Sequence, residues 1–250
     1  MGAAFLVSCD NIDENERWSD WQKITPQRNV LVEDFTGQKC SNCPQAAQTV
    51  ENLKQDLLKV YDSSHIISVA IHGGPMAMSE SAYGPEIGLG NQLGDDYVNL
   101  FEVTTWPKAQ IDRTGLLESS AWTDRIMSQM GKAATADLKV TPTYDAATRE
   151  VKVTVEVSST VNDNANVQVW LTESDIAAPQ TGWGGSIYTH NHVLRATMNG
   201  LSGDENVTLP FTKTYSLILS EYWDANNMAV VAFAYNSSGV MQSVEEKIIK

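Results

Sequence analysis

The segment Lys39-Cys40-Ser41-Asn42-Cys43 limits the possible folds of this chain more than any other feature of its sequence. It follows an apolar run that begins at Val30 and ends at Phe35, and it precedes a stretch with helical periodicity. A Cys-x-x-Cys pair where a strand runs into a helix is the usual setting of dithiol–disulfide chemistry. Backbone N–H groups and the dipole at the helix start stabilise a thiolate there. The sequence therefore predicts that strand, dithiol and helix form one unit.

The residues around the dithiol predict a β-α-β unit. The run from Asn29 to Phe35 is apolar enough for a buried strand, and residues 45–60 place their apolar side chains on one helical face. Pro44 falls in the first turn of that helix, where its missing N–H costs nothing. The β-branched run Ile66 to Ile71 predicts a second, parallel strand. Three more elements are expected: a helix near residues 90–101, a strand over 109–113 and an amphipathic helix over 119–134.

Beyond residue 135 the pattern changes to short alternating strands. Val151, Val153, Val155 and Val157 alternate with polar residues, which is the periodicity of a strand with one buried face. Turn residues separate this run from similar runs at 167–171, 193–195, 207–211 and 228–235. The pattern predicts an α/β domain over residues 28–134, followed by an all-β, immunoglobulin-like antiparallel sandwich over 135–250.

The charge balance excludes some partners. The chain has 17 Lys and Arg against 31 Asp and Glu, a formal net charge of −14. Such a surface repels phosphate backbones, so we expect no nucleic-acid partner. No apolar run approaches the ~18 residues that a spanning helix needs, so a membrane contact would require a lipid anchor. We expect no cofactor.

The N-terminus offers such an anchor. Leu6-Val7-Ser8-Cys9 resembles a bacterial lipobox, in which the cysteine is acylated, although no Lys or Arg precedes it. On this interpretation residues 1–9 are a remnant of a lipoprotein signal and the acidic residues 10–27 are a tether. The alternative is an incidental Cys9 in a flexible terminus. Lipidation would imply an extracytoplasmic compartment, where disulfides persist.

Residues 28–134 resemble thioredoxin through three separated features. The run from Val30 to Phe35 leads into the dithiol, with Asp34 six residues before Cys40, where thioredoxins also carry an acid. The dithiol begins the helix of a β-α-β unit. Trp106-Pro107 precedes a strand, at the position where thioredoxin-like folds place a cis-proline facing the dithiol.

The chain as a whole resembles the outer-membrane-protein-28-related lipoproteins of Bacteroidetes. The segments that carry this resemblance are Glu33-Asp34-Phe35-Thr36-Gly37-Gln38-Lys39-Cys40-Ser41-Asn42-Cys43-Pro44 and His190-Asn191-His192-Val193-Leu194-Arg195. The resemblance implies an outer-membrane lipoprotein with a thioredoxin-like domain. It implies no particular biochemical activity.

These residues predict dithiol oxidoreduction on protein thiols or disulfides. Cys40 would be the nucleophilic thiolate, favoured by the charge of Lys39, and Cys43 would resolve the mixed disulfide. A buried Asp34 would take the proton from Cys43. A cis Pro107 would leave the backbone of Trp106 free to pair with an extended substrate. Lys39 stands where active thioredoxins carry an aromatic residue, and Trp106 is bulkier than the usual residue before the proline.

Two other interpretations remain open. In the first, Cys40 and Cys43 form a structural disulfide, and the sandwich binds an extracellular protein or glycan. Trp183 and Tyr188 in the Gly-rich segment 181–188 would then stack on the ligand, unless Trp183 simply folds onto the sandwich. The second is a metal site formed by His190 and His192, if they share a strand face, with the cysteine sulfurs. Structural histidines are the expectation instead, and no second metal-binding motif completes a zinc set.

Overall fold

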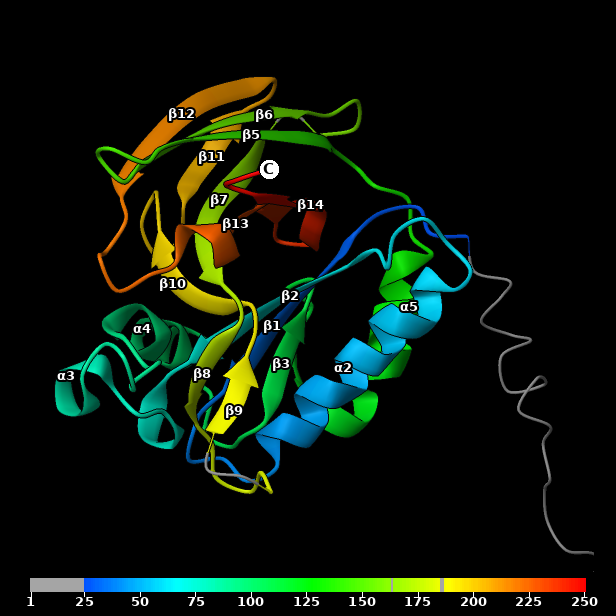
Figure 1. Ribbon diagram of the computed structural model, residues 1–250. Helices are drawn as coiled ribbons and strands as arrows, with labels where there is room; N and C mark the ends of the chain where they lie inside the picture. The colour runs from blue at the N-terminus through cyan, green and yellow to red at the C-terminus, as the bar shows by residue number, and fades with distance from the viewer. Residues whose placement is uncertain (1–24, 163, 185–186) are drawn as a thin grey trace, which may run out of the picture.

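The central strands form around the dithiol segment. The structure is a computed structural model that describes residues 25–162, 164–184 and 187–250. Strands β1 (Val30–Thr36) and β2 (Ile66–His72) run parallel, and helix α2 (Cys43–Leu58) connects them (Figure 1). Every residue of β1 is buried, as expected for a central strand covered on both faces. The predicted β-α-β unit is present. Cys9 and residues 10–24 of the predicted tether lie outside the described residues.

Two shorter strands extend the sheet beyond β1. Strand β3 (Lys108–Ile111) pairs antiparallel with β1, with Lys108 opposite Phe35, and β4 (Leu116–Glu118) follows it. The strand predicted over 109–113 ends at Ile111, because Asp112 and Arg113 turn the chain with φ angles of 51° and 54°. This turn places the Arg113 side chain under the sheet instead of along the strand.

Helices cover both faces of these strands. Helix α5 (Trp122–Met130) and α2 pack against one face, where Val32, Leu53 and Ile126 share a core. Helix α4 (Gln92–Leu100) and the short α3 (Glu80–Tyr83) lie on the opposite side (Figure 1). The helices predicted at 45–60, 90–101 and 119–134 are therefore present with shifted ends. None of the helices in the described ranges is long and apolar enough to cross a membrane.

The second half consists of antiparallel strands around a core of its own. That core joins Val151, Val153 and Val155 to Val169 and Val230. The strands are β5 (Asp137–Asp145), β6 (Glu150–Ser158), β7 (Asn164–Glu173), β10 (Val193–Thr197), β11 (Asp204–Thr208), β12 (Phe211–Ile218), β13 (Met228–Asn236) and β14 (Gly239–Lys247). The prediction of a single strand over 207–211 was wrong. The strand structure is interrupted at Leu209 and Pro210, where β11 ends and β12 has not yet begun.

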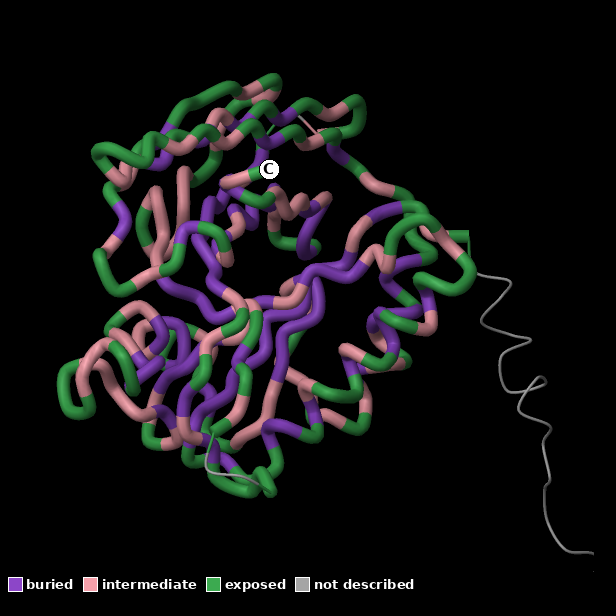
Figure 2. The backbone as a smooth tube through the Cα atoms, in the orientation of Figure 1, coloured by how far each residue is buried: buried purple, intermediate pink, exposed green. Residues whose placement is uncertain are grey.

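One sheet runs through both halves of the chain. Its strands follow the order β14-β13-β7-β10-β2-β1-β3-β4, while β12, β6 and β5 form a separate antiparallel sheet. The junction is the pairing of β10 with β2, in which Val193 stands opposite Ala70 and the Ala70 N–H donates to the His192 carbonyl at 2.8 Å. Figure 2 shows the buried residues continuing across this junction. The molecule is thus a mixed α/β sheet joined to antiparallel β-sheet.

An aromatic cluster with a buried ion pair packs across the junction. Arg113 donates to Glu33 with an Nη2–Oε1 distance of 3.0 Å, and neither side chain is more than 8% exposed. The Arg113 guanidinium lies 4.4 Å from the ring centroid of Tyr235 and 4.7 Å from that of Phe233. Trp170 lies against the same cation. Residues of both halves therefore share one core.

Candidate functional site

The two cysteines form a disulfide at the start of α2. Cys40 and Cys43 are bonded, and Cys43 is the first helical residue. Pro44 occupies the first turn, where its missing N–H leaves no hydrogen bond unmade. Cys40 is 5% exposed and Cys43 is 2% exposed. The pair is placed as the sequence predicts, but it is buried.

Backbone contacts hold the loop before the disulfide. The Lys39 N–H donates to the Met76 carbonyl at 2.8 Å, and the Cys40 N–H donates to the Gly37 carbonyl at 3.0 Å. A Cβ at Gly37 would lie 2.3 Å from the Met76 oxygen, so only glycine permits this approach. The Lys39 ammonium lies 5.3 Å from the ring centroid of Tyr83. Lys39 is therefore the sequence neighbour of Cys40, but its ammonium group lies over the Tyr83 ring.

A hairpin from the second half covers the disulfide. Strands β8 (Ile176–Pro179) and β9 (Ile187–His190) form it, and they pair only with each other. Gln180 Nε2 donates to the Cys40 carbonyl at 2.8 Å, and the Thr181 N–H donates to the Gln38 carbonyl at 2.8 Å. Gly182, with a φ of +81°, lies so close that a Cβ there would be 2.5 Å from the Ser41 oxygen. The hairpin therefore excludes solvent from the dithiol.

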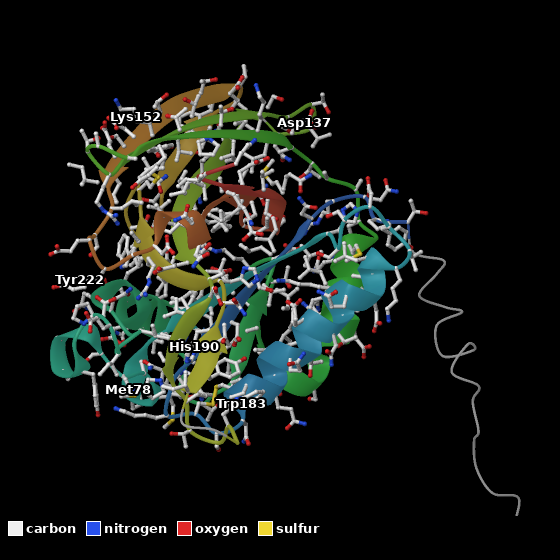
Figure 3. The ribbon with its side chains drawn as sticks, in the orientation of Figure 1. Met78, Asp137, Lys152, Trp183, His190 and Tyr222 are labelled. Atoms are coloured by element: carbon white, nitrogen blue, oxygen red, sulfur yellow. A yellow bond between two sulfur atoms is a disulfide. The ribbon has the colours of Figure 1, made fainter. Side chains whose placement is uncertain are left out.

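The position of this hairpin corrects one expectation about Trp183. Figure 3 shows Trp183 at the opposite end of the molecule from Asp137 and Lys152, which lie on the β5–β6 sheet. Its ring packs edge-on against Tyr188, with 4.8 Å between centroids. Trp183 therefore folds toward the dithiol rather than onto the separate antiparallel sheet.

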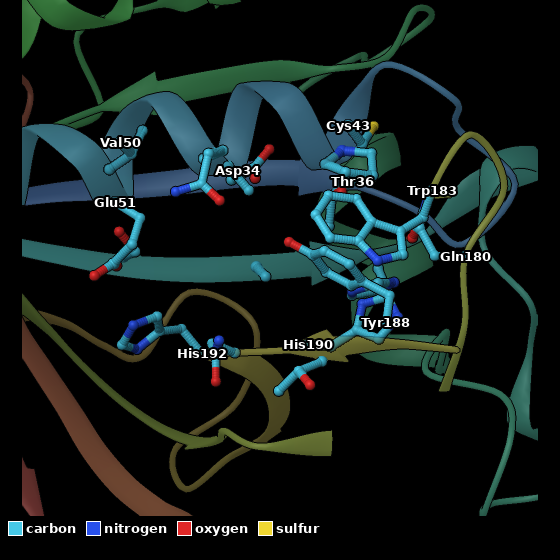
Figure 4. Close-up of a pocket in the computed structure, with 18 of the residues that line it drawn as sticks. Asp34, Thr36, Cys43, Val50, Glu51, Gln180, Trp183, Tyr188, His190 and His192 are labelled. Carbon is cyan, nitrogen blue, oxygen red and sulfur yellow. The ribbon is translucent and has the colours of Figure 1, made fainter. Parts of the chain in front are cut away.

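Asp34 lies beneath the disulfide in a nearly dry environment. It projects from β1 into a cavity that Cys43 also lines (Figure 4). Burial raises the pKa of Asp34 to about 8, and its Oδ1 has no hydrogen-bond partner among the described residues. The carboxyl group is therefore mostly protonated at neutral pH, and its ionised fraction, which grows toward pH 8, is the form that can take a proton from Cys43.

The Trp106–Pro107 pair lies on the other side of the dithiol segment. The peptide bond between them is cis. Because Lys108 stands opposite Phe35, Pro107 is level with the end of β1, from which the chain enters the dithiol loop. The indole of Trp106 packs against Gly74, on the face covered by α4. It does not line the cavity beside Asp34.

The cavity lies between α2, strands β1 and β2, and the hairpin, and it measures about 330 Å³. Ser68 and His72 of β2 line it opposite Tyr188 and His190 of β9. The pKa of His72 is held well below its usual value by burial, and burial lowers the pKa of His190 to about 4. Sequence reasoning missed Gln180, Ser68 and His72 as site residues, and it considered His190 only as a metal ligand. The alternation in Ile187-Tyr188-Thr189-His190 is the one sequence signal that could have predicted a strand there.

The histidines do not form the metal site considered from the sequence. Strand β9 ends at His190, and His192 lies beyond the turn with a φ of 57°, so the two do not share a strand face. His192 Nε2 is 3.2 Å from Lys54 Nζ, and its Nδ1 is 3.5 Å from Glu245. Within the described ranges, no group of three His, Cys, Asp or Glu side chains is arranged to hold a metal.

These features define a mixed α/β protein with a disulfide at a helix start, closed over by a β-rich second half. In a comparison with protein families, the family described as outer membrane protein Omp28 matches residues 94–250, which is more than half of the chain. This chain belongs to the Omp28 family. The predicted family and the outer-membrane location are confirmed. The matched residues begin after the dithiol, in α4.

One solved structure supports the fold. HBP35 of Porphyromonas gingivalis superposes with a TM-score of 0.73 at 18% identity, covering 91% of this chain and 77% of that chain. A domain of the outer membrane lipoprotein Omp28 from Porphyromonas gingivalis matches at 24% identity with a TM-score of 0.35, over 47% of this chain and 90% of that one. A comparison with curated proteins finds no match.

Proposed function

We propose that this outer membrane protein carries out thiol–disulfide exchange at Cys40 and Cys43 on a thioredoxin-like scaffold. The observation that carries the proposal is the buried, unpaired Asp34 in the cavity that Cys43 lines. A structural disulfide needs no such acid, and burying a carboxyl without a partner costs folding free energy. An acid with a pKa of about 8 can exchange protons with a thiol near neutral pH.

In the exchange, the Cys40 thiolate attacks one sulfur of a substrate disulfide and releases the other substrate sulfur as a thiolate. The thiol of Cys43 loses its proton to the Asp34 carboxylate. The Cys43 thiolate then attacks Cys40 Sγ, displaces the second substrate thiolate and forms the Cys40–Cys43 disulfide. Two electrons pass to the substrate, and the reverse sequence oxidises a substrate dithiol. Lys39 adds positive charge near Cys40.

The proposed substrate is a protein segment in extended conformation. The backbone of Trp106, next to Pro107 and level with the end of β1, would pair with it as an added strand. Because Cys40 is only 5% exposed, the β8–β9 hairpin must move before a protein substrate can reach it. Lipidation at Cys9 remains our proposal for attachment, and incorporation of labelled palmitate by wild type but not Cys9→Ala tests it.

The alternative is a binding protein in which the disulfide is structural and the β-rich half, proposed to be immunoglobulin-like, holds an extracellular protein or glycan. The burial of both cysteines under a bonded hairpin favours it. In this alternative the hairpin and the disulfide stabilise each other, and the cysteine pair does not take part in repeated thiol–disulfide exchange.

The reduction potential of the pair distinguishes the two functions. The protein would be equilibrated in glutathione or dithiothreitol buffers and its thiols trapped, with Cys40→Ser as the control that cannot form the disulfide. A potential between about −120 and −270 mV, with rapid exchange on a model disulfide, is expected for an oxidoreductase. A potential below about −300 mV with slow exchange would assign the pair a structural role.

A further inference from the structure

The cavity beside the dithiol collects buried polar atoms that have no partner. In the described part of the chain, eight buried side-chain nitrogen or oxygen atoms lack a hydrogen bond, and four of them line this one cavity. They are Asp34 Oδ1, Ser68 Oγ, His72 Nδ1 and His190 Nε2. Each buried polar atom without a partner costs about 1–3 kcal/mol, so four such atoms around one cavity favour the binding of a polar molecule there.

The four atoms come from three strands that meet at the cavity. Asp34 of β1 stands opposite Ala70 of β2, and Ser68 and His72 lie two residues to either side of Ala70 on the same strand face. His190 of β9 approaches from the hairpin, with 5.3 Å between its ring centroid and that of His72 (Figure 4). Asp34, His72 and His190 are each more than nine-tenths buried. The polar groups therefore converge on one cavity, which is partly open to solvent beside Trp183.

These groups are uncharged at neutral pH. Burial raises the pKa of Asp34 to about 8 and lowers the pKa of His190 to about 4, and it holds the pKa of His72 well below the usual value. Two charged residues, Lys54 and Glu51, also line the cavity, and they face each other at 3.9 Å. Lys54 Nζ also lies 3.2 Å from His192 Nε2, so neither charge is free. A charged ligand would therefore enter without a free counter-charge.

The size of the cavity and the residues that line it further restrict which ligands can bind. A volume of about 330 Å³ holds roughly ten water molecules, which is more than a structural water needs and is at the small end for ligand pockets. Val32, Val50 and Ala47 form an apolar wall, and Tyr188 and Trp183 add aromatic surface. Apolar walls with a few converging polar groups are typical of sites for small organic molecules.

We propose that this cavity binds a small uncharged ring compound that carries both hydrogen-bond donors and acceptors, of the size of a monosaccharide or a nucleobase. The protonated Asp34 donates to it, Ser68 donates or accepts, and His72 and His190 adapt by tautomer. The aromatic surface of Tyr188 and Trp183 covers a ring face. Ligand binding differs from the thiol chemistry, although both use Asp34.

Titration calorimetry of the full chain tests the proposal with two matched pairs of probes. Glucose and uracil are the uncharged rings, and glucosamine and orotate are their charged counterparts. We expect at least one uncharged ring to bind with a dissociation constant below about 1 mM, and its charged counterpart to bind at least tenfold more weakly. Binding of glucose alone identifies a sugar site, and binding of uracil alone identifies a site for heterocycles.

Two variants tie the binding to the cavity. Ser68→Ala removes one unpartnered hydroxyl and should weaken binding about tenfold, while Ser158→Ala on β6 is the distant control. Ala70 of β2 lines the cavity opposite Asp34, so the larger side chain in Ala70→Leu should fill the space and abolish binding. Circular dichroism would confirm that this variant folds. Binding is measured on the oxidised protein and independently of its reduction potential, so failure here is distinct from failure of the redox proposal.

Three outcomes would overturn the proposal. The first is no binding of glucose or uracil at about 10 mM, together with a crystal structure in which the cavity holds water alone. The second is a charged probe that binds as tightly as its uncharged counterpart, because Asp34 would then act as an anion or Lys54 as a free cation. The third is an affinity that neither Ser68→Ala nor Ala70→Leu changes.

Discussion

Asp34 and Asp112 show how much a single partner changes a buried acid. Asp112 pairs with Arg28 and accepts from the Leu31 N–H, and its pKa is raised only to about 6. Asp34 has no such partner, and burial alone raises its pKa to about 8. The folded protein therefore holds the Asp34 proton more tightly than the unfolded chain does. Linkage turns this difference into a dependence of stability on pH.

Asp34→Asn should remove that dependence. Between about pH 4 and pH 8 the folded wild type retains a proton that the unfolded chain loses, so its stability falls as pH rises through this interval. We expect wild type to lose about 5 kcal/mol relative to Asp34→Asn across it, measured by urea unfolding of the oxidised protein. Asp62→Asn, at an exposed aspartate, is the control. Parallel pH profiles for wild type and Asp34→Asn would contradict the assignment.

Among the elements, the β8–β9 hairpin has the largest influence on the dithiol. It is a two-stranded ribbon that pairs with no other strand, and an isolated hairpin is marginally stable in water. Its position depends on contacts with the dithiol loop, chiefly the bonds from Gln180 and Thr181. The hairpin should therefore open more readily than the sheet strands do.

Gln180→Ala should make the disulfide easier to reach. The substitution removes the 2.8 Å bond to the Cys40 carbonyl, a loss of about 1 kcal/mol that favours the open hairpin roughly fivefold. We expect dithiothreitol to reduce the disulfide about fivefold faster, followed by thiol trapping. Gln48→Ala, which removes an exposed glutamine of α2 bonded to Asn52, is the matched control. Equal rates for all three proteins would show that the hairpin does not limit access.

The prediction from sequence succeeded where contacts are local. The strand before the dithiol, its helix and the alternating valines of β6 follow from periodicity over a few residues. The docking of the hairpin on the dithiol was missed because its contacts with Cys40 join residues about 140 positions apart, and no local pattern encodes such a contact. His190 was expected to be structural for the same reason. The facing positions of His72 and His190 appear only once β9 lies over β2.

At the scale of the whole molecule, the continuous sheet makes the two halves interdependent. β10 pairs with β2, and the Glu33–Arg113 ion pair lies under rings from both halves. Removing one partner of a buried pair leaves an uncompensated charge, whereas an exposed pair contributes little. The boundary predicted at 134–135 falls between α5 and β5, and one of the hydrophobic cores contains residues from both sides of it.

Glu33→Gln should therefore destabilise the entire protein in one transition. We expect a loss of about 3 kcal/mol, detected together by far-ultraviolet circular dichroism and tryptophan fluorescence. Glu156→Gln breaks the exposed pair with Lys139 and should cost less than about 1 kcal/mol. Glu33→Leu/Arg113→Met should recover most of the loss. Two separate transitions would instead show that the halves unfold independently.

The hairpin also sets an order of events during biogenesis. Residues 40 and 43 emerge about 140 positions before the residues that will cover them, and a chain generally folds from its N-terminus as it appears. The thiols are therefore open to an oxidant of the cell envelope only until β8 and β9 dock. Once docking is complete, the redox state of the pair can change only when the hairpin opens. The oxidation state of the newly folded protein is therefore set before β8 and β9 dock, and every later change depends on the opening of the hairpin.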